Sequence, residues 1–266
     1  MTDGKRDLKK PAFGGARIRE IPLRIVIPNL ITVLAICAGL TGIRLAFEGR
    51  FELAVVMVIV AAALDALDGR TARMLKGSSK FGAQMDSLAD IVNFGVAPAL
   101  VLYAYLLHQL GSPGWIAALI FAIACALRLA RFNVMAEDPD RPAWQDAYFV
   151  GVPAPAGAVV VMLPVYLGFI GVPLGAESAL AAGVYTVLVG FLMVSRIRVY
   201  SGKAPGKRIQ RDVVPLFILG AVLLIMLFFT YTWYTLAAGV VAYLAFLPFS
   251  VRAYRRRESR EAAKRG

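Results

Sequence analysis

The sequence predicts an all-α, polytopic membrane protein with about eight transmembrane helices. Of its 266 residues, 59% are hydrophobic and only 17% are charged, and the mean hydropathy is +0.68. These values are too apolar for an ordinary soluble domain. The apolar runs are about 20 residues long, which is the length that a helix needs to cross the roughly 30 Å hydrocarbon core of a bilayer.

The apolar runs follow one another along most of the chain, after a basic N-terminal segment that we expect to end in an interfacial helix near residues 17–27. The expected spans are, in order, about 30–47, 51–75, 82–110, 115–135, 153–170, 179–195, 213–231 and 233–251. Pro164 predicts a kink in the fifth span, because proline removes a helical hydrogen bond. The basic tail from Arg252 is expected to be the frayed end of the last helix.

The basic residues are distributed unevenly between the two sides of this topology. With eight spans, 27 of the 29 Lys and Arg residues lie on the side of the N-terminus, and only Arg44 and Arg50 lie on the other. Cytoplasmic loops carry such an excess of positive charge. We therefore expect a multi-pass protein of the cell (inner) membrane with both termini in the cytoplasm. The basic tails are expected to contact anionic lipid, and no nucleic-acid partner is indicated.

Four aspartates within 26 residues stand out in this apolar sequence. Asp65 and Asp68 are three residues apart, and Asp86 and Asp90 are four apart, so each pair shares one face of a helix. A short polar turn separates the pairs, so two antiparallel helices could bring them together at the cytoplasmic face. Like charges so close repel one another, and clustered carboxylates of this kind suit a hard divalent ion such as Mg²⁺ or Mn²⁺.

Two other interpretations of the aspartates were weighed. They could form ion-paired helix caps, Asp65 with Arg73 or Asp90 with a lysine. They could also belong to a proton or cation pathway, but a pathway predicts acidic groups near the middle of the later spans, where the sequence has none. A metal site at the membrane surface fits the pattern better.

Small and basic residues beside the aspartates indicate a phosphorylated ligand. Gly69 and Gly82 lack side chains where a bulky ligand could approach the backbone, and Arg73 could make a bidentate contact with a phosphate. Metal ions next to an arginine can hold a diphosphate and stabilise a leaving phosphate, and a remaining carboxylate can act as a base. The residues thus indicate phosphoryl or phosphatidyl transfer from an amphiphilic donor.

The same stretch resembles the signature of the CDP-alcohol phosphotransferase family. The residues that match its fixed positions are Asp65, Asp68, Gly69, Ala72, Arg73, Gly82, Asp86 and Asp90. Further segments resemble the phosphatidylserine synthases of this family, and they extend the resemblance to about Lys203. These segments are residues 94–98, 128–133, 149–155 and 193–195.

The resemblance implies a six-helix catalytic core and roles for individual residues. The expected division is a basic segment 1–28, a catalytic core 29–212, two further helices 213–251 and a basic tail 252–266. Asp65 and Asp86 would bridge two divalent ions, Asp68 would complete the first site, and Asp90 would contact the second and act as the base. The implied contacts to CDP-diacylglycerol are Asn29, Thr32, Gly69, Ala72, Arg73, Ser79 and Gly82. Asn29 has the alternative of being a simple helix N-cap.

The resemblance further implies transfer of a phosphatidyl group from CDP-diacylglycerol to L-serine, giving phosphatidylserine and CMP, by a homodimer. Arg131 is the candidate for the serine carboxylate, with a topological anchor as its alternative. The same chemistry with glycerol 3-phosphate, inositol phosphate or choline as the acceptor stays open. A cation transporter is the alternative from another class of protein.

Overall fold

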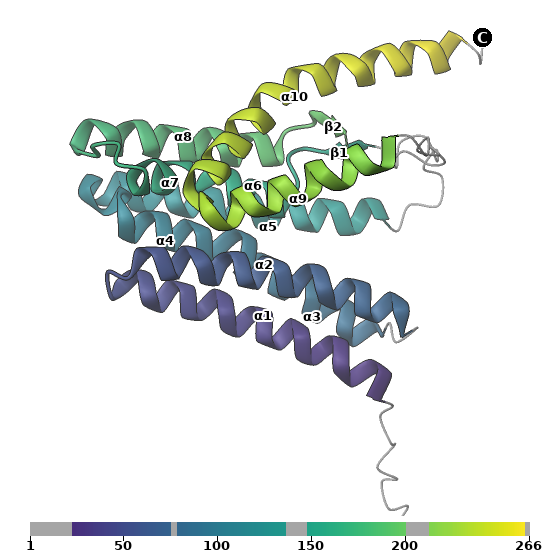
Figure 1. Cartoon of the computed structure of the whole chain (residues 1–266), viewed down its shortest axis with the longest axis horizontal. Coiled ribbons are helices and arrows are strands. Elements are labelled where there is room, and N and C mark those ends of the chain that lie inside the picture. Colours follow the sequence, from purple (N-terminus) through teal and green to yellow (C-terminus); the bar gives the residue numbers. More distant parts are fainter. Residues whose placement is uncertain (1–22, 76–78, 137–147, 201–212, 264–266) are drawn as a thin grey trace, which may run out of the picture.

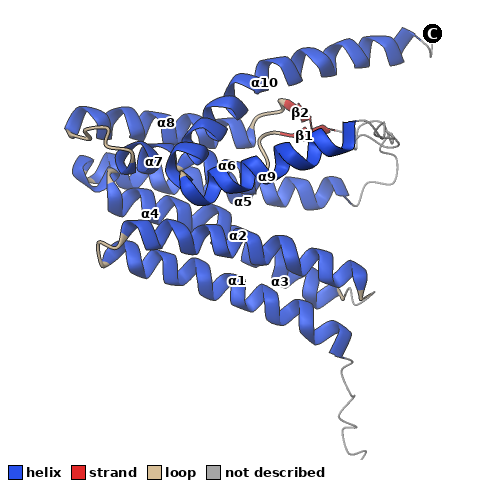
Figure 2. Ribbon diagram, in the orientation of Figure 1, coloured by secondary structure: helices blue, strands red, loops and turns tan. Residues whose placement is uncertain are grey.

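The computed structural model describes residues 23–75, 79–136, 148–200 and 213–263. Helices make up nearly all of this part of the chain, which confirms the all-α class (Figure 2). The elements are, in order, α1 (Leu23–Phe47), α2 (Phe51–Met74), α3 (Lys80–Asp90), the π-helical η1 (Ile91–Val96), α4 (Ala97–Tyr105), the 3₁₀ turn η2 (Leu107–Leu110), α5 (Ser112–Ala136), β1 (Tyr148–Val150), α6 (Ala154–Val161), α7 (Leu163–Phe169), α8 (Ala176–Val194), β2 (Arg198–Tyr200), α9 (Val214–Thr230) and α10 (Thr232–Ala263).

Each of the eight predicted spans is helical, and five helical stretches are long and apolar enough to cross a membrane. These five are Val26–Phe47, Lys80–Tyr105, Ser112–Met135, Ala176–Val194 and Thr232–Tyr254. The stretches Ala154–Phe169 and Val214–Thr230 are apolar but shorter. α2 is long, but it carries Glu52 near its start and the first aspartate pair near its end. The chain is therefore a multi-pass membrane protein.

α1 and α2 form an antiparallel hairpin along one side of the molecule (Figure 1). The turn between them is made at Gly49, whose φ of +76° favours glycine. The seam is built from small residues, since Ala35, Ala54 and Ala61 are fully buried and a Cβ on Gly42 would lie 3.0 Å from the carbonyl oxygen of Ala54. Small side chains let two helices in a membrane approach closely. This approach fixes the N-terminal part of α1 beside the C-terminal end of α2.

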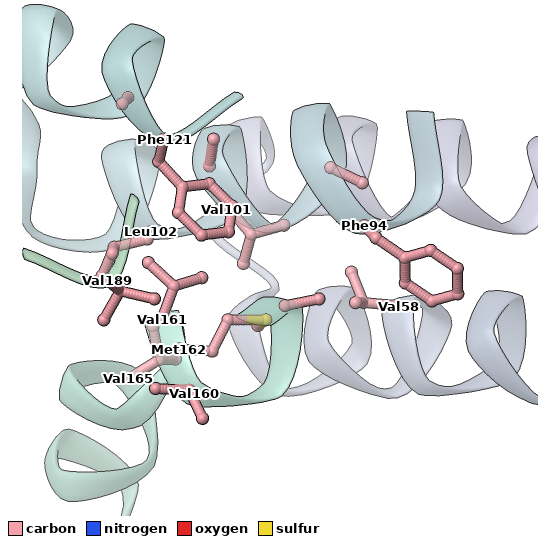
Figure 3. Close-up of a cluster of buried hydrophobic side chains, with 14 of the residues drawn as sticks. Val58, Phe94, Val101, Leu102, Phe121, Val160, Val161, Met162, Val165 and Val189 are labelled. Atoms are coloured by element: carbon pink, nitrogen blue, oxygen red, sulfur yellow. The ribbon is translucent and has the colours of Figure 1, made fainter. Parts of the chain in front are cut away.

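The hydrophobic core lies where η1, α4 and α5 meet α6, α7 and α8. Figure 3 shows Leu102, Phe121, Val161 and Val189 gathered at this centre and Phe94 further along, next to Val58. Phe94, Leu102, Phe121, Val161 and Val189 are at most 1% exposed. The same elements carry the site on their edge, because α3 continues through η1 into α4 and so ties the second aspartate pair to the core.

α9 stands outside this core. None of its residues is buried, and its packing is against α10. α10 contacts α6, α7 and β2, and it buries Ala237, Val240 and Leu247. The last helix is therefore joined to the rest of the helical core, while α9 presents apolar side chains on nearly all sides, as lipid-facing helices do.

Several expected boundaries were wrong. α1 begins at Leu23 rather than near Leu30 and runs through Pro28, where it loses one backbone hydrogen bond. The third span is not one regular helix, because Ala97 donates its N–H to Val92 five residues back and so forms a π-turn. α10 does not end near Val251 but continues as a helix to Ala263. The proposed interfacial helix falls mostly outside the described residues.

The later part of the chain contains a broken helix at Pro164 and a short pair of strands. The predicted kink at Pro164 is confirmed, because the helix divides between Val161 and Leu163. The strands β1 and β2 were not predicted; they pair antiparallel, with Phe149 opposite Val199. Gly151 follows β1 with φ +73°, and its N–H donates to the carbonyl of Ile197 at 2.7 Å.

We expect Gly151→Ala to destabilise the protein strongly, because the added Cβ would meet the backbone carbonyl of Met193 in addition to the cost of a positive φ. Gly111→Ala is the matched control, since Gly111 also has a positive φ (+64°) but nothing lies within 4 Å of its Cβ position. The control should cost about 1–3 kcal/mol, because its φ of +64° with ψ −131° is a backbone conformation that alanine rarely adopts. Thermal unfolding in detergent measures both, and equal melting temperatures of the two variants would contradict the steric argument.

Candidate active site

The helical hairpin brings Asp68 of α2 against Thr32 of α1. The Thr32 hydroxyl donates to Asp68 Oδ2 at 2.7 Å, and the Pro28 carbonyl lies 3.1 Å away as a second acceptor. Both side chains are buried, with only 3% of each residue exposed. One carboxylate oxygen of Asp68 is thus held in place by α1, and the other is left for a different partner.

The start of α3 is fixed against α1 in a similar way. Ser79 is the N-cap of α3, and its Oγ accepts from the N–H of Gly82 at 2.9 Å. A Cβ on Gly82 would lie 2.8 Å from Asn29 Oδ1 and 3.1 Å from Ser79 Oγ. Gly82 thus allows α3 to pack closely on Asn29, whose side chain would have to move to make room for a Cβ.

The aspartates of the two helices meet at this end of the hairpin. Carboxylate oxygens of Asp65, Asp68 and Asp86 lie within 4.8 Å of one another. Asp90, one helical turn further along α3, is in contact with the carboxyl group of Asp65 and interacts electrostatically with Asp86 and Asp68. The predicted convergence of the two pairs is therefore present in the structure.

The cluster has the donor set of a divalent-cation site. Asp65 Oδ1 and Asp68 Oδ1 are buried and have no hydrogen-bond partner among the described residues. No arginine or lysine in the described ranges forms an ion pair with any of the four aspartates, so the ion-paired caps are absent there; the ion pair found is Arg44 with Glu48. Orphaned carboxylate oxygens that repel one another fit a hard cation such as Mg²⁺ or Mn²⁺.

A cleft of about 630 Å³, partly open to solvent, adjoins the cluster. Its lining contains all seven residues expected to contact the donor, which are Asn29, Thr32, Gly69, Ala72, Arg73, Ser79 and Gly82, together with Asp68 and Asp86. The Arg73 side chain folds back over Gly69, whose added Cβ would meet only Arg73 Nη1, at 3.8 Å. Packing among the described residues thus does not require Gly69 to lack a side chain.

The structure corrects one alternative for Asn29. Because α1 begins at Leu23, Asn29 lies inside the helix and is not its N-cap. Ser79, by contrast, has a structural task as the N-cap of α3 while it also lines the cleft.

A second, smaller pocket of about 280 Å³ includes Arg128, which interacts electrostatically with Asp90. It is lined by Arg128, Arg131, Phe132, Met135, Phe149 and Val150. Arg131 donates to the carbonyl of Val194 at 2.6 Å and so also anchors the end of α8. Arg128 belongs to the segment 128–133 that resembles the phosphatidylserine synthases; it is buried, stacks on Phe132 at 5.5 Å and interacts electrostatically with Asp90. Arg128 and Arg131 are charged residues inside an apolar span, and such residues commonly have a function.

The comparisons with known proteins agree with this geometry. The CDP-alcohol phosphatidyltransferase family profile matches residues 25–194, and a second profile, CDP-alcohol phosphatidyltransferase 2, matches residues 212–248. The chain belongs to the CDP-alcohol phosphatidyltransferase family.

Curated relatives carry the name CDP-diacylglycerol–serine O-phosphatidyltransferase. The protein from Mycobacterium leprae is 52% identical over 145 residues, covering 54% of this chain and 47% of the relative. The protein from Helicobacter pylori strain J99 is 42% identical over 175 residues, covering 64% and 70%. The protein from Bacillus subtilis is 34% identical over 172 residues, covering 65% and 88%. The chain spans about half the length of the mycobacterial relatives that it matches.

We expect Asp86→Asn to weaken the binding of Mn²⁺ by roughly tenfold or more, because it removes a charged ligand from the cluster, and even outer-shell changes at metal sites cost 10–100-fold. Electron paramagnetic resonance of Mn²⁺ titrated into the detergent-solubilised protein measures the affinity without substrate. Glu48→Gln is the control. Glu48 forms an ion pair with Arg44 at the turn between α1 and α2, and this variant should bind Mn²⁺ as the unmodified protein does. Equal Mn²⁺ affinity of the Asp86→Asn and Glu48→Gln variants would mean that the metal binds outside the aspartate cluster.

Proposed function

We propose that this chain transfers a phosphatidyl group from CDP-diacylglycerol to L-serine and releases CMP. The observation that carries the proposal is the junction of α1, α2 and α3, where an aspartate cluster adjoins a cleft lined by every expected donor-binding residue. The names of the relatives support serine as the acceptor.

The cluster would hold the divalent ions. Asp65 and Asp86 would bridge two ions, Asp68 would complete the first site and Asp90 would contact the second. Bound Mg²⁺ or Mn²⁺ would hold the non-bridging oxygens of the diphosphate and stabilise the leaving phosphate. The hydrogen bond from Thr32 fixes Asp68, so its free oxygen points to one place before any ligand arrives.

The cleft would bind the cytidine diphosphate part of the donor. Arg73 presents a guanidinium group next to Gly69, which suits a bidentate contact with phosphate oxygens. The open backbone at Gly69 lets a flat or bulky group lie close to α2. Asn29 and Ser79 supply polar atoms at the other wall of the cleft.

Asp90 would act as the base. It is in contact with Asp65 of the cluster and interacts electrostatically with Arg128, which lines the second pocket. In the proposed reaction Asp90 takes the proton of the serine hydroxyl, the serine oxygen attacks the β-phosphorus of CDP-diacylglycerol in line, and the bond to the CMP oxygen breaks. General-base catalysis of this kind requires the carboxylate to lie within hydrogen-bond reach of the hydroxyl.

The second pocket would bind the acceptor. Arg131 stays a candidate for the serine carboxylate, although it also holds the carbonyl of Val194. Arg128 is the stronger candidate, because it faces Asp90 and has no hydrogen-bonded partner at its buried Nε among the described residues. Two arginines favour an anionic acceptor, so glycerol 3-phosphate is the second candidate, and they disfavour the cation choline.

A cation transporter has less support. In the described parts of α4 to α10, acidic side chains occur only near helix ends, with Glu177 at the start of α8. The cluster therefore lies at one end of the helices without an acidic path leading from it. We place this end, and both termini, at the cytoplasmic side of the inner membrane, on the basis of the distribution of Lys and Arg. The homodimer implied by the family stays a prediction.

With purified protein in lipid vesicles, we expect CMP to be released from CDP-diacylglycerol when L-serine is added. Release with glycerol 3-phosphate, inositol phosphate or choline should be at least tenfold slower, because a site built for one polar acceptor leaves its groups unpaired with another. If CMP is released faster with glycerol 3-phosphate than with L-serine, glycerol 3-phosphate is the acceptor. Ion flux without CMP release would indicate a transporter.

Asp90→Asn should remove turnover while leaving the binding of CDP-diacylglycerol largely intact, because the amide cannot take the proton. We expect CMP release to fall by roughly 10²–10⁴-fold, the usual contribution of general-base catalysis. Single-turnover CMP release measures the reaction, and a nucleotide-displacement assay measures donor binding. The control is Glu177→Gln at the exposed start of α8. Retained turnover in Asp90→Asn would refute its assignment as the base.

A further inference from the structure

Two asparagine side chains pack onto glycines between α1 and the continuous segment formed by α3 and η1. Asn29 on α1 lies against Gly82 on α3, where an added Cβ would be 2.8 Å from the asparagine Oδ1. Asn93 on η1 lies against Gly39 on α1 in the reverse arrangement, and there the corresponding distance would be 2.5 Å. Each side therefore contributes one asparagine and one glycine, and the two contacts are reciprocal.

The two contacts lie on either side of the aspartate cluster along the helices. From the first contact to the second, α1 advances by ten residues and the α3–η1 segment by eleven, which is about 15 Å along a helix axis. Thr32, which holds Asp68, lies between the contacts on α1, and Asp86 and Asp90 lie between them on α3. The relative position of α1 and α3 is thus fixed at both ends of the stretch that carries the carboxylates.

Asn93 is the more deeply buried of the two asparagines. None of the residue is exposed, and neither its Oδ1 nor its Nδ2 has a hydrogen-bond partner among the described residues. An apolar side chain would fill this space without the cost of burying an amide group, so filling space does not account for an asparagine here. The Cβ position of a glycine lies along one of its Cα–H bonds, so Asn93 Oδ1 faces a Cα–H of Gly39. Weak Cα–H···O contacts of this kind recur between packed helices.

Asn93 also lies inside the π-turn between α3 and α4. The turn closes with the hydrogen bond from the Ala97 N–H to the Val92 carbonyl, and the Cβ of Ala97 would lie 3.8 Å from a Cβ added to Gly39. The irregular turn is therefore seated on one glycine of α1. π-turns are rare inside α-helices and are frequent at functional sites, and this one follows Asp90 directly. A side chain at position 39 would push the turn away from α1, and α3 with its aspartates would move with it.

We infer that Gly39 and Asn93 are positioning residues, whose contact sets how closely α3 approaches α1 and α2 and so sets the spacing of the four carboxylates. This inference rests on the proposed metal site and deepens it. Neither residue is among the described residues that line the cleft beside the aspartates, so neither is expected to touch the donor. The affinity of a carboxylate cluster for a divalent ion depends on the geometry and rigidity of its ligands, and groups outside the ligand shell act through them.

The test is a double-mutant cycle with Mn²⁺ alone as the probe. Gly39→Ala, Asn93→Ala and the double variant are compared with the unmodified protein in detergent. Electron paramagnetic resonance measures the Mn²⁺ affinity, and thermal unfolding measures the stability. We expect Gly39→Ala to weaken Mn²⁺ binding by roughly tenfold, the lower end of the effect of changes outside the ligand shell. Asn93→Ala, which removes the contact without a clash, should weaken it by roughly threefold, because α3 is then held less firmly.

In the double variant, the new methyl group at position 39 occupies space that the amide has left. The double variant should therefore bind Mn²⁺ roughly threefold more tightly than Gly39→Ala, because contacting residues do not act additively. Gly220→Ala on α9 is the control, since nothing lies within 4 Å of its Cβ position, and it should bind Mn²⁺ as the unmodified protein does.

Independent effects would multiply and make the double variant bind Mn²⁺ more weakly than either single variant, and that result overturns the inference. A Gly39→Ala protein with a lower melting temperature and unchanged Mn²⁺ affinity also overturns it, because that pattern shows a structural role alone. If Gly39→Ala does not fold, unchanged Mn²⁺ affinity in Asn93→Ala overturns the inference and weakened affinity supports it. If the unmodified protein binds no Mn²⁺, the proposed metal site fails and the roles of Gly39 and Asn93 fail with it.

Discussion

The mutual repulsion of buried carboxylates is the constraint on which this structure depends. Asp65 and Asp68 each keep a buried oxygen without a partner among the described residues, and Asp86 and Asp90 approach them from α3. The surrounding contacts hold the carboxylates together, through the small-residue seam of α1 and α2, the hydroxyl of Thr32 and the packing of Gly82 on Asn29. A site built in this way is prepared for positive charge before a ligand arrives, as preorganised electrostatic sites are.

Much of the architecture and of the site could be predicted from the sequence. The spans followed from apolar length, and the convergence of the aspartates followed from their spacing of three and four residues. The boundaries of the helices were less predictable. The π-turn, for example, depends on the hydrogen bond from the Ala97 N–H to the Val92 carbonyl, and no local sequence pattern predicts that bond. The short strands were missed because three residues carry too weak a pattern. The sequence marked Arg128 only as part of the segment 128–133, because its interaction with Asp90 depends on how α5 packs beside α3.

The two ends of the chain contribute differently to the site. α1 carries Asn29 and Thr32, which line the cleft beside the aspartates. α10 contacts β2, where the Arg198 guanidinium lies 5.3 Å from the ring of Tyr254. β1 pairs with β2 and places Phe149 at the arginine-lined pocket. The cleft is thus formed by three helices between residues 28 and 86, whereas the arginine-lined pocket comes from residues 128–150.

The π-turn of η1 has a consequence for changes in chain length. Each residue of a regular helix advances the side-chain direction by about 100°. A π-turn fits one extra residue into a single turn, so the helices on its two sides keep nearly the relative orientation of an unbroken α-helix that is one residue shorter. Removing one residue between Ile91 and Val96 would therefore replace the π-turn by α-helix and leave the aspartates facing α2. An unbroken α-helix of the present length would instead turn the carboxylates away from α2 by about that angle.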